Sequence, residues 1–138
     1  MAGWTRLFVA MNLAAYRITR GWVGGKMGGQ TVLLLTTLGR RSGKLHTIPI
    51  NYYLDQERFV IVASNWGSDH QPAWYINLRH DPHATLQVKE KIIKVSAKFA
   101  EGAEYERLWQ YVTSRNSLYS GYQKQTQRKI PLVIFSPI

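Results

Sequence analysis

The sequence predicts a mainly β fold of about six strands with flanking helices, closed into a small barrel. Short apolar runs rich in branched residues recur between residues 31 and 135, and turn-forming residues separate them. The runs stand next to one another as hairpins, while amphipathic stretches fill the remaining gaps. Six short antiparallel strands cannot cover a core as an open sheet, so closure is expected. A chain of 138 residues argues for one domain, spanning 1–138.

The composition is that of a basic globular protein. Hydrophobic residues make up 45% of the chain and there is no cysteine, which excludes disulfides, thiolate metal sites and cysteine nucleophiles. The 18 lysines and arginines against eight acidic residues give a net charge of +10, and all eight acids lie within 55–106. The charge therefore predicts an anionic partner: a nucleic acid, an anionic membrane surface or a phosphorylated small molecule.

The first 29 residues predict an amphipathic helix over 3–20 and a glycine-rich connector over 21–29. The apolar part of the helix is shorter than the roughly 20 residues of a membrane span. Arg17 and Arg20 stand where a signal-peptide cleavage site would be needed. We therefore expect a cytoplasmic protein whose first helix packs on the core or lies on the inner face of the cell membrane.

The strands begin with residues 31–37, a short apolar run bounded by glycines that predicts a strand buried on both faces. A tight polar turn over 39–44 follows. Residues 46–54 alternate loosely, and a turn at 55–57 separates them from the apolar run 59–63. This order predicts that 46–54 and 59–63 form a hairpin.

A second hairpin is predicted from 85–89 and 92–99, because apolar residues occur at strand spacing on both sides of a turn at Glu90. Residues 131–135 form the last strand. Residues 72–79 predict a short helix with proline in its first turn, and 103–115 predict a longer one with acids first and Arg115 near its end.

The turn 39–44 is the strongest candidate anion site. Arg40, Arg41 and Lys44 supply cations, Ser42 supplies a hydroxyl, and the glycines free backbone N–H groups that could converge on a phosphate. The spacing of a Walker loop is absent, and a strand rather than a helix follows. The same pattern is also typical of a solvated basic hairpin turn.

The loop 63–72 leaves a strand and enters a helix, where functional loops often sit. Ser64 and Asn65 offer neutral hydrogen bonds and Trp66 a flat apolar face, which suits a heterocyclic ring. A triad of Ser64, Asp69 and His70 is an alternative, but no nucleophile elbow surrounds the serine. The four histidines lack the spacing of paired metal ligands, so no metal is expected.

Tyr119 and Tyr122 stand three positions apart and share a face if their segment is helical. Their phenols could line an apolar pocket and donate to a substrate oxygen. Two core tyrosines with solvated hydroxyls fit the spacing equally well.

Five ordered blocks resemble the deazaflavin (F420)-dependent nitroreductase family, which includes F420H2-dependent quinone reductases. The blocks are Leu-Leu-Leu-Thr-Thr-x-Gly-Arg-Arg-Ser-Gly (33–43), Pro49 with Asn51-Tyr52, Val-Ala-Ser (62–64), Pro-Ala-Trp-Tyr-x-Asn-Leu (72–78) with Asp81-Pro82, and Tyr-x-x-Tyr-Gln-x-x-Thr-x-Arg-x-Ile-Pro (119–131). The resemblance runs from about residue 12 to the end. It implies a split β-barrel related to flavin-binding, pyridoxamine-phosphate-oxidase-like barrels.

The resemblance also implies a cofactor and a reaction. Reduced coenzyme F420 would pass a hydride to a quinone, a nitro compound or an activated alkene such as an enone, and the basic turn would hold the phosphodiester and polyglutamate tail. The residues that match coenzyme-binding positions are Arg40, Arg41, Ser42, Gly43, Lys44, His46, Thr47, Ile48, Pro49, Ile50, Asn51, Ala63, Ser64, Asn65, Trp66, Ala73, Trp74, Tyr75, Ile76 and Asn77.

Ser64, Tyr119 and Tyr122 are the predicted catalytic residues, as donors to the acceptor oxygen, and no residue has to act as a general base. Three departures from the family pattern lie in or beside the basic turn. Arg41 replaces a common lysine, Leu45 a frequent proline and His46 a frequent arginine, while Asn116 stands where some members carry a third tyrosine. The coenzyme is therefore predicted more firmly than the acceptor.

Two other functions compete with this prediction. An FMN-dependent oxidase or reductase would use the same barrel. A nucleic-acid-binding module would use the basic charge, but the cations are not interleaved with aromatics along one strand, so no nucleic-acid partner is expected. The chain is expected to be a monomer or a homodimer.

Overall fold

The computed structural model describes residues 26–27 and 30–138. The predicted helix 3–20 and most of the connector 21–29 lie outside the described residues. The strands are β1 (Lys26–Met27), β2 (Gln30–Leu38), β3 (Leu45–Asn51), β4 (Tyr53–Asp55), β5 (Arg58–Val62), β6 (His83–Val88), β7 (Lys91–Phe99) and β8 (Leu132–Pro137). The helices are the short 3-10 turn η1 (Asn65–Gly67), α3 (Ala73–His80), α4 (Gly102–Arg115) and α5 (Leu118–Gln125).

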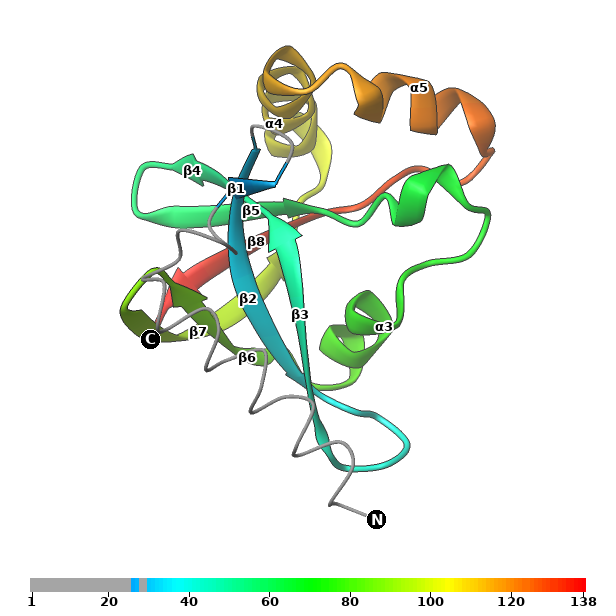
Figure 1. Ribbon diagram of the computed structural model, residues 1–138. Coiled ribbons are helices and arrows are strands. Elements are labelled where there is room, and N and C mark those ends of the chain that lie inside the picture. Colours follow the sequence, from blue (N-terminus) through cyan, green and yellow to red (C-terminus); the bar gives the residue numbers. More distant parts are fainter. Residues whose placement is uncertain (1–25, 28–29) are drawn as a thin grey trace.

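The strands form one curved antiparallel sheet in the order β1-β2-β6-β7-β8-β5-β4, with β3 also paired to β2 (Figure 1). The predicted fold class, mainly β with flanking helices, is confirmed. The described residues form eight strands, where about six were predicted, because β1 is a two-residue strand and the predicted strand 46–54 is divided in two.

Strand β2 is the centre of this arrangement. Its residues Leu33 and Leu35 are fully buried, and β2 pairs with β3 on one side and with β6 on the other. An apolar run that is buried on both faces is what such a doubly paired strand requires. The predicted buried strand 31–37 is confirmed.

The first predicted hairpin is partly wrong. Residues 46–54 do not pair as one strand with 59–63: β3 pairs with β2, and only β4 pairs with β5. The change of partner occurs at Tyr52, whose backbone N–H donates to the carbonyl of Thr31 over 3.1 Å while its ring packs against Phe59. The second hairpin is confirmed, with His83 opposite Ser96 and Val88 opposite Lys91.

Two hydrophobic cores lie on opposite faces of β5 and β8. Ile61 and Val133 belong to the core inside the barrel, whereas Val60 and Ile134 belong to a second core beneath α4 and α5. This alternation follows from the period of two of a β-strand. Helix α4 confirms the predicted helix 103–115, and α3 confirms 72–79. No helix among residues 30–138 combines the length and apolarity needed to cross a membrane.

Candidate functional site

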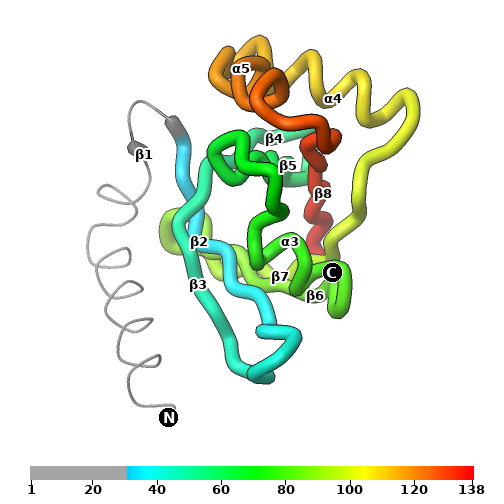
Figure 2. The backbone as a smooth tube through the Cα atoms, turned by 90° about the vertical axis from the view of Figure 1, so that its right-hand side faces the viewer, coloured from blue at the N-terminus to red at the C-terminus, as the bar shows by residue number. Residues whose placement is uncertain are grey.

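A groove with two adjacent lobes, each of about 600 Å³, runs between β3 and the segment formed by loop 63–72 and α3. Both lobes are lined by Ile48, Asn65, Pro72 and Trp74, so they lie next to each other along the same groove. In Figure 2, β2 and β3 lie on the left, α3 and the loop before it in the centre, and α5 above them. We call the end near the turn 39–44 the cationic lobe and the end near α5 the aromatic lobe.

The cationic lobe is built on Asn77, a buried amide of α3. Its Oδ1 accepts hydrogen bonds from the backbone N–H of Arg40 over 3.2 Å and from the Arg40 guanidinium over 2.8 Å, while its Nδ2 donates to Thr37 Oγ1 over 3.3 Å. These bonds fix the basic turn against α3. Within the part of the chain that the structure describes, no carboxylate pairs with Arg41 or Lys44, so their charges stay available for an anion.

The basic turn is compact because Gly39 has no side chain. A Cβ there would lie 2.6 Å from Ser42 Oγ and 2.7 Å from His46 Nε2, both closer than atoms can approach. The Ser42 hydroxyl accepts from the backbone N–H of Lys44 over 3.1 Å. This close packing gathers a hydroxyl, an imidazole and cations at one end of the groove.

The aromatic lobe carries neutral polar groups among apolar walls. Ser64, Trp66, Tyr119 and Tyr122 line it, and the hydroxyls of Tyr119 and Tyr53 are 3.0 Å apart. Burial, followed by the hydrogen bond with Tyr53, raises the pKa of Tyr119. The phenol therefore keeps its proton at neutral pH and can serve as a hydrogen-bond donor.

The loop over this lobe has three consecutive residues with positive φ: Asn65 at 46°, Trp66 at 59° and Gly67 at 80°. Left-handed backbone is costly for residues other than glycine, so surrounding contacts must hold it. Trp66 is 80% exposed and meets Tyr122 edge-on, with ring centroids 6.3 Å apart. The turn thus presents an indole at the rim of the groove.

Arg128 holds this loop from the other side. Its guanidinium donates to the carbonyl oxygens of Ser64 over 2.8 Å and Ala63 over 3.3 Å and to Gln71 Oε1 over 2.9 Å, while its Nε donates to the Ser68 carbonyl over 2.8 Å. Burial lowers the pKa of Arg128. The sequence does not indicate this role beyond the position of Arg128 in the block 119–131.

Most of the predicted coenzyme-binding residues line the groove. The structure brings together Arg40, Arg41, Ser42, His46, Ile48, Pro49, Ile50, Asn51, Ser64, Asn65, Trp66, Ala73, Trp74 and Asn77. It does not place Gly43, Lys44, Thr47, Ala63, Tyr75 or Ile76 in the lining. Lys44 still contacts the basic turn through Ser42, whereas Tyr75 lines a different cavity on the far side of α3.

The alternative triad is not assembled. Asp69 accepts a hydrogen bond from Thr126 over 2.7 Å, and the backbone N–H of His70 donates to Ser68 Oγ. No hydrogen bond among the described residues joins the side chains of Ser64, Asp69 and His70. Similarly, no three potential metal ligands gather within the described segments.

The donor set fits an elongated ligand with an anionic tail and a flat, neutral polar head. Guanidinium, imidazole and hydroxyl groups gather at one end, with the Lys44 backbone joined to Ser42 in the same turn, and phenols, amides and an indole lie at the other. A coenzyme with a charged tail and a heterocyclic ring has this distribution of groups.

Known proteins that are similar to this chain are described as enzymes that depend on such a coenzyme. An F420H(2)-dependent quinone reductase of Mycobacterium tuberculosis (strain H37Rv) is 36% identical over 127 residues, 89% of this chain and 85% of that protein. A solved F420-H2-dependent reductase has a TM-score of 0.70 at 31% identity, covering 76% of this chain and 93% of its own. Another solved structure, described as a domain-swapped dimer, has a TM-score of 0.71 at 27% identity, covering 92% of this chain and 99% of its own.

At the level of fold alone, the likeness extends to a Listeria innocua protein provisionally assigned as a pyridoxamine 5'-phosphate oxidase. The TM-score is 0.54 at 14% identity, with 77% of this chain and 82% of the other covered. The barrel therefore has the split-barrel fold of pyridoxamine-phosphate-oxidase-like proteins. The family model of the F420H(2)-dependent quinone reductases matches residues 4–137, so the chain belongs to this family.

Proposed function

We propose that the protein transfers a hydride from reduced coenzyme F420 to a quinone. The observation that carries the proposal is the polarity of the two adjacent lobes of the groove, cationic at the basic turn and neutral at the phenols. Arg40, Arg41, Ser42 and Lys44 hold the anionic tail. The strands and loops around Ile48, Ser64 to Trp66 and Ala73 to Trp74 enclose the ring.

The coenzyme, when bound, supplies two electrons and a proton as a hydride. The chain's own residues bind and orient the acceptor. Tyr119, Tyr122 and Ser64 donate hydrogen bonds to the acceptor oxygen on which negative charge grows, which stabilises the transition state. Trp66 and Leu118 at the rim limit the access of water. The negative charge left on the acceptor oxygen would be balanced by the one proton released when the reduced coenzyme is oxidised, so no side chain has to act as a net proton donor or acceptor.

The acceptor class follows from the aromatic lobe. Its walls are apolar and its polar groups carry no charge, which suits a flat neutral molecule with a carbonyl or nitro oxygen. A quinone meets this description, and nitro compounds and enones present the same type of oxygen.

The test is a titration with coenzyme F420 and, separately, with FMN, followed by a screen of quinones, nitro compounds and enones with the reduced coenzyme. We expect tight binding of F420, weaker binding of FMN, and oxidation of F420H2 dependent on added quinone. Tight FMN binding without F420 binding would replace the proposal with an FMN-dependent enzyme on the same barrel.

We also propose that the protein forms a homodimer and associates with the surface of the cytoplasmic membrane. The solved relative described as a domain-swapped dimer supports the first statement, and light scattering on the purified chain tests it. The second rests on the predicted helix 3–20. Sedimentation with anionic and with neutral vesicles, using the full chain and an Arg17→Gln/Arg20→Gln variant, tests it. Equal pelleting in all four mixtures would show that the cations of the helix do not bind the protein to the membrane.

A further inference from the structure

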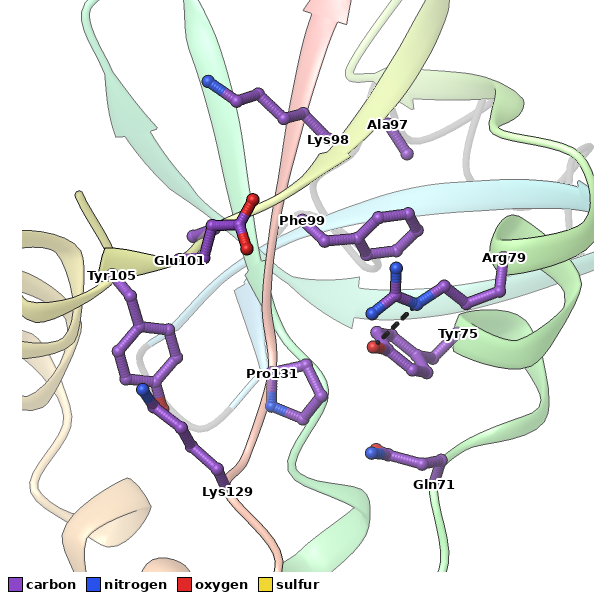
Figure 3. Close-up of a pocket in the computed structure, with 11 residues that line it drawn as sticks. Gln71, Tyr75, Arg79, Ala97, Lys98, Phe99, Glu101, Tyr105, Lys129 and Pro131 are labelled. Carbon is purple, nitrogen blue, oxygen red and sulfur yellow. Dashed lines mark hydrogen bonds between the residues drawn. The ribbon is translucent and has the colours of Figure 1, made fainter. Parts of the chain in front are cut away.

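A second cavity of about 580 Å³ lies on the face of α3 that is turned away from the groove (Figure 3). Tyr75 and Arg79 of α3, Phe99 of β7, Tyr105 of α4 and Pro131 before β8 form its walls. Trp74 and Asn77, by contrast, face the groove, so α3 separates the two cavities. Nothing in the proposed function uses this second cavity.

Arg79 is the main polar group of this cavity. Its guanidinium carbon lies 4.0 Å from the centroid of the Phe99 ring, and its Nε donates to the Tyr75 hydroxyl over 3.0 Å. Figure 3 shows the guanidinium between these two rings. In the described part of the chain no carboxylate pairs with Arg79, so its two terminal nitrogens keep their hydrogens for another acceptor.

The remaining charges leave a moderate positive field. Lys98 is paired with Glu104 at 3.3 Å, but Glu104 also pairs with Arg58 at 3.1 Å, so it offsets the charge of exposed Lys98 only in part. The Lys129 ammonium lies 4.0 Å from the centroid of the Tyr105 ring. It also lies 3.9 Å from a carboxylate oxygen of Glu106, a long and exposed ion pair that contributes little. Glu101 adds one negative charge to the lining. A ligand with a single negative charge suits this balance better than a doubly charged phosphate.

The rings and the charges together define a ligand class. A planar guanidinium held by stacking binds a carboxylate through two parallel hydrogen bonds. Phe99 and Pro131 offer apolar surface beside it, on which an aromatic ring can pack, whereas the Tyr105 ring is already stacked on Trp109 and contacted by Lys129. We propose that this cavity is a binding site for a small aromatic monocarboxylate, with its carboxylate on Arg79 and its ring on Phe99 and Pro131.

Titration of the full chain with benzoate, followed by calorimetry and by backbone amide NMR shifts, tests the site. We expect saturable binding with shifts at Tyr75, Arg79 and Phe99, and at least tenfold weaker binding of benzamide, which is isosteric but uncharged. Arg79→Gln should weaken benzoate binding at least tenfold. Arg115→Gln is the matched control, because Arg115 also lies over a tyrosine ring, that of Tyr111, but lines no cavity described here; it should leave binding unchanged.

Coenzyme titration separates this inference from the proposed function. F420 affinity should be the same in wild type and Arg79→Gln, and benzoate should still bind when F420 is saturating. Three results would each overturn the assignment. The first is an unchanged benzoate affinity in Arg79→Gln, and the second is loss of benzoate binding when F420 is added. The third is a failure of benzoate to bind together with a dimer that Arg79→Gln dissociates. If Arg79→Gln does not fold, Arg79→Lys replaces it: it keeps the charge but loses the two parallel N–H groups, so benzoate should bind threefold to tenfold more weakly, and unchanged affinity would overturn the assignment.

Discussion

The Arg128 guanidinium donates to the carbonyl oxygen of Ser64 over 2.8 Å, although the two residues are 64 positions apart. The same side chain reaches Ala63, Ser68 and Gln71. One residue shortly before the last strand therefore donates hydrogen bonds to several backbone carbonyls of the loop that borders the groove. Because that loop includes left-handed residues, its shape depends on contacts supplied from outside it.

Replacing Arg128 by methionine should loosen this loop. The carbonyls of Ala63 and Ser68 would lose the Arg128 donor, and that of Ser64 would keep only the Gly67 backbone N–H, at a cost of about 1–3 kcal/mol in the free energy of unfolding. Coenzyme affinity should also fall, since Ser64 and its neighbours line the groove. Urea unfolding and F420 titration measure the two effects. Arg115→Met, an exposed arginine at the end of α4, is the control and should change neither; equal behaviour of the two variants would contradict the role of Arg128.

Gly67→Ala and Gly121→Ala form a matched pair with opposite expected signs. At Gly67 φ is +80°, and a Cβ would lie 2.6 Å from Gln125 Oε1 and 3.1 Å from the Tyr122 backbone, so alanine should destabilise the protein by about 1–3 kcal/mol. Gly121 lies within α5 with nothing within 4 Å of the added Cβ, so alanine should stabilise by about 0.5–1 kcal/mol. Thermal unfolding of both variants gives the comparison. A Gly67→Ala protein that unfolds at the wild-type temperature would show that the contacts of α5 do not restrict the residue at position 67.

Tyr119→Phe and Tyr122→Phe should each lower turnover by about tenfold to a hundredfold, because each removes a hydrogen-bond donor to the acceptor oxygen. F420 affinity should change little. Since burial raises the pKa of Tyr119, turnover should not depend on its ionisation between pH 6 and 9. Steady-state kinetics with a quinone over that pH range provide the measurement. Tyr53→Phe, which removes one hydrogen-bond partner of the Tyr119 hydroxyl but leaves that hydroxyl in place, is the control. Full activity in both Tyr119→Phe and Tyr122→Phe would rule out the donor role.

Asp55 should make stability depend on acidity. Hydrogen bonds from Arg107 and then from Arg58 lower its pKa from 3.8 to about 2. A lowered carboxyl pKa contributes stability above the unfolded value of 3.8, and this contribution disappears as the pH falls through about 2. Asp55→Asn should cost about 1 kcal/mol at pH 7, because exposed Arg107 is screened by solvent, and only a small part of that at pH 2, where the folded-state carboxyl is about half protonated. Urea unfolding at several pH values tests this, with the exposed Glu57→Gln as a control of constant stability.

The parts of the fold that sequence predicted well depend on short-range signals. The hairpin of β6 and β7 has alternating apolar residues and one tight turn, so its pairing is local. The strand 46–54 has the same kind of signal, yet its first part pairs with β2 and its last part with β5. Alternation indicates that residues form a strand but does not say which of two strands becomes the partner.

The candidate site shows the same limit. The basic turn and the loop 63–72 are each a single continuous segment, so their polar residues could be identified directly from the sequence. Arg128 could not, because its acceptors are carbonyl oxygens about 60 positions away. Tyr75 was grouped with Trp74, but adjacent residues of a helix point in different directions, so Tyr75 belongs to the other cavity.

The uneven charge of the groove has a consequence for how a ligand enters it. Arg41 and Lys44 stand at one end, while the end beneath α5 is neutral, so the electric field attracts an elongated anion by its tail first. The initial encounter then occurs at the basic turn, and the head settles afterwards between the phenols. Ionic strength should accordingly govern how often coenzymes are captured, whereas the fit of the head should govern how long they stay.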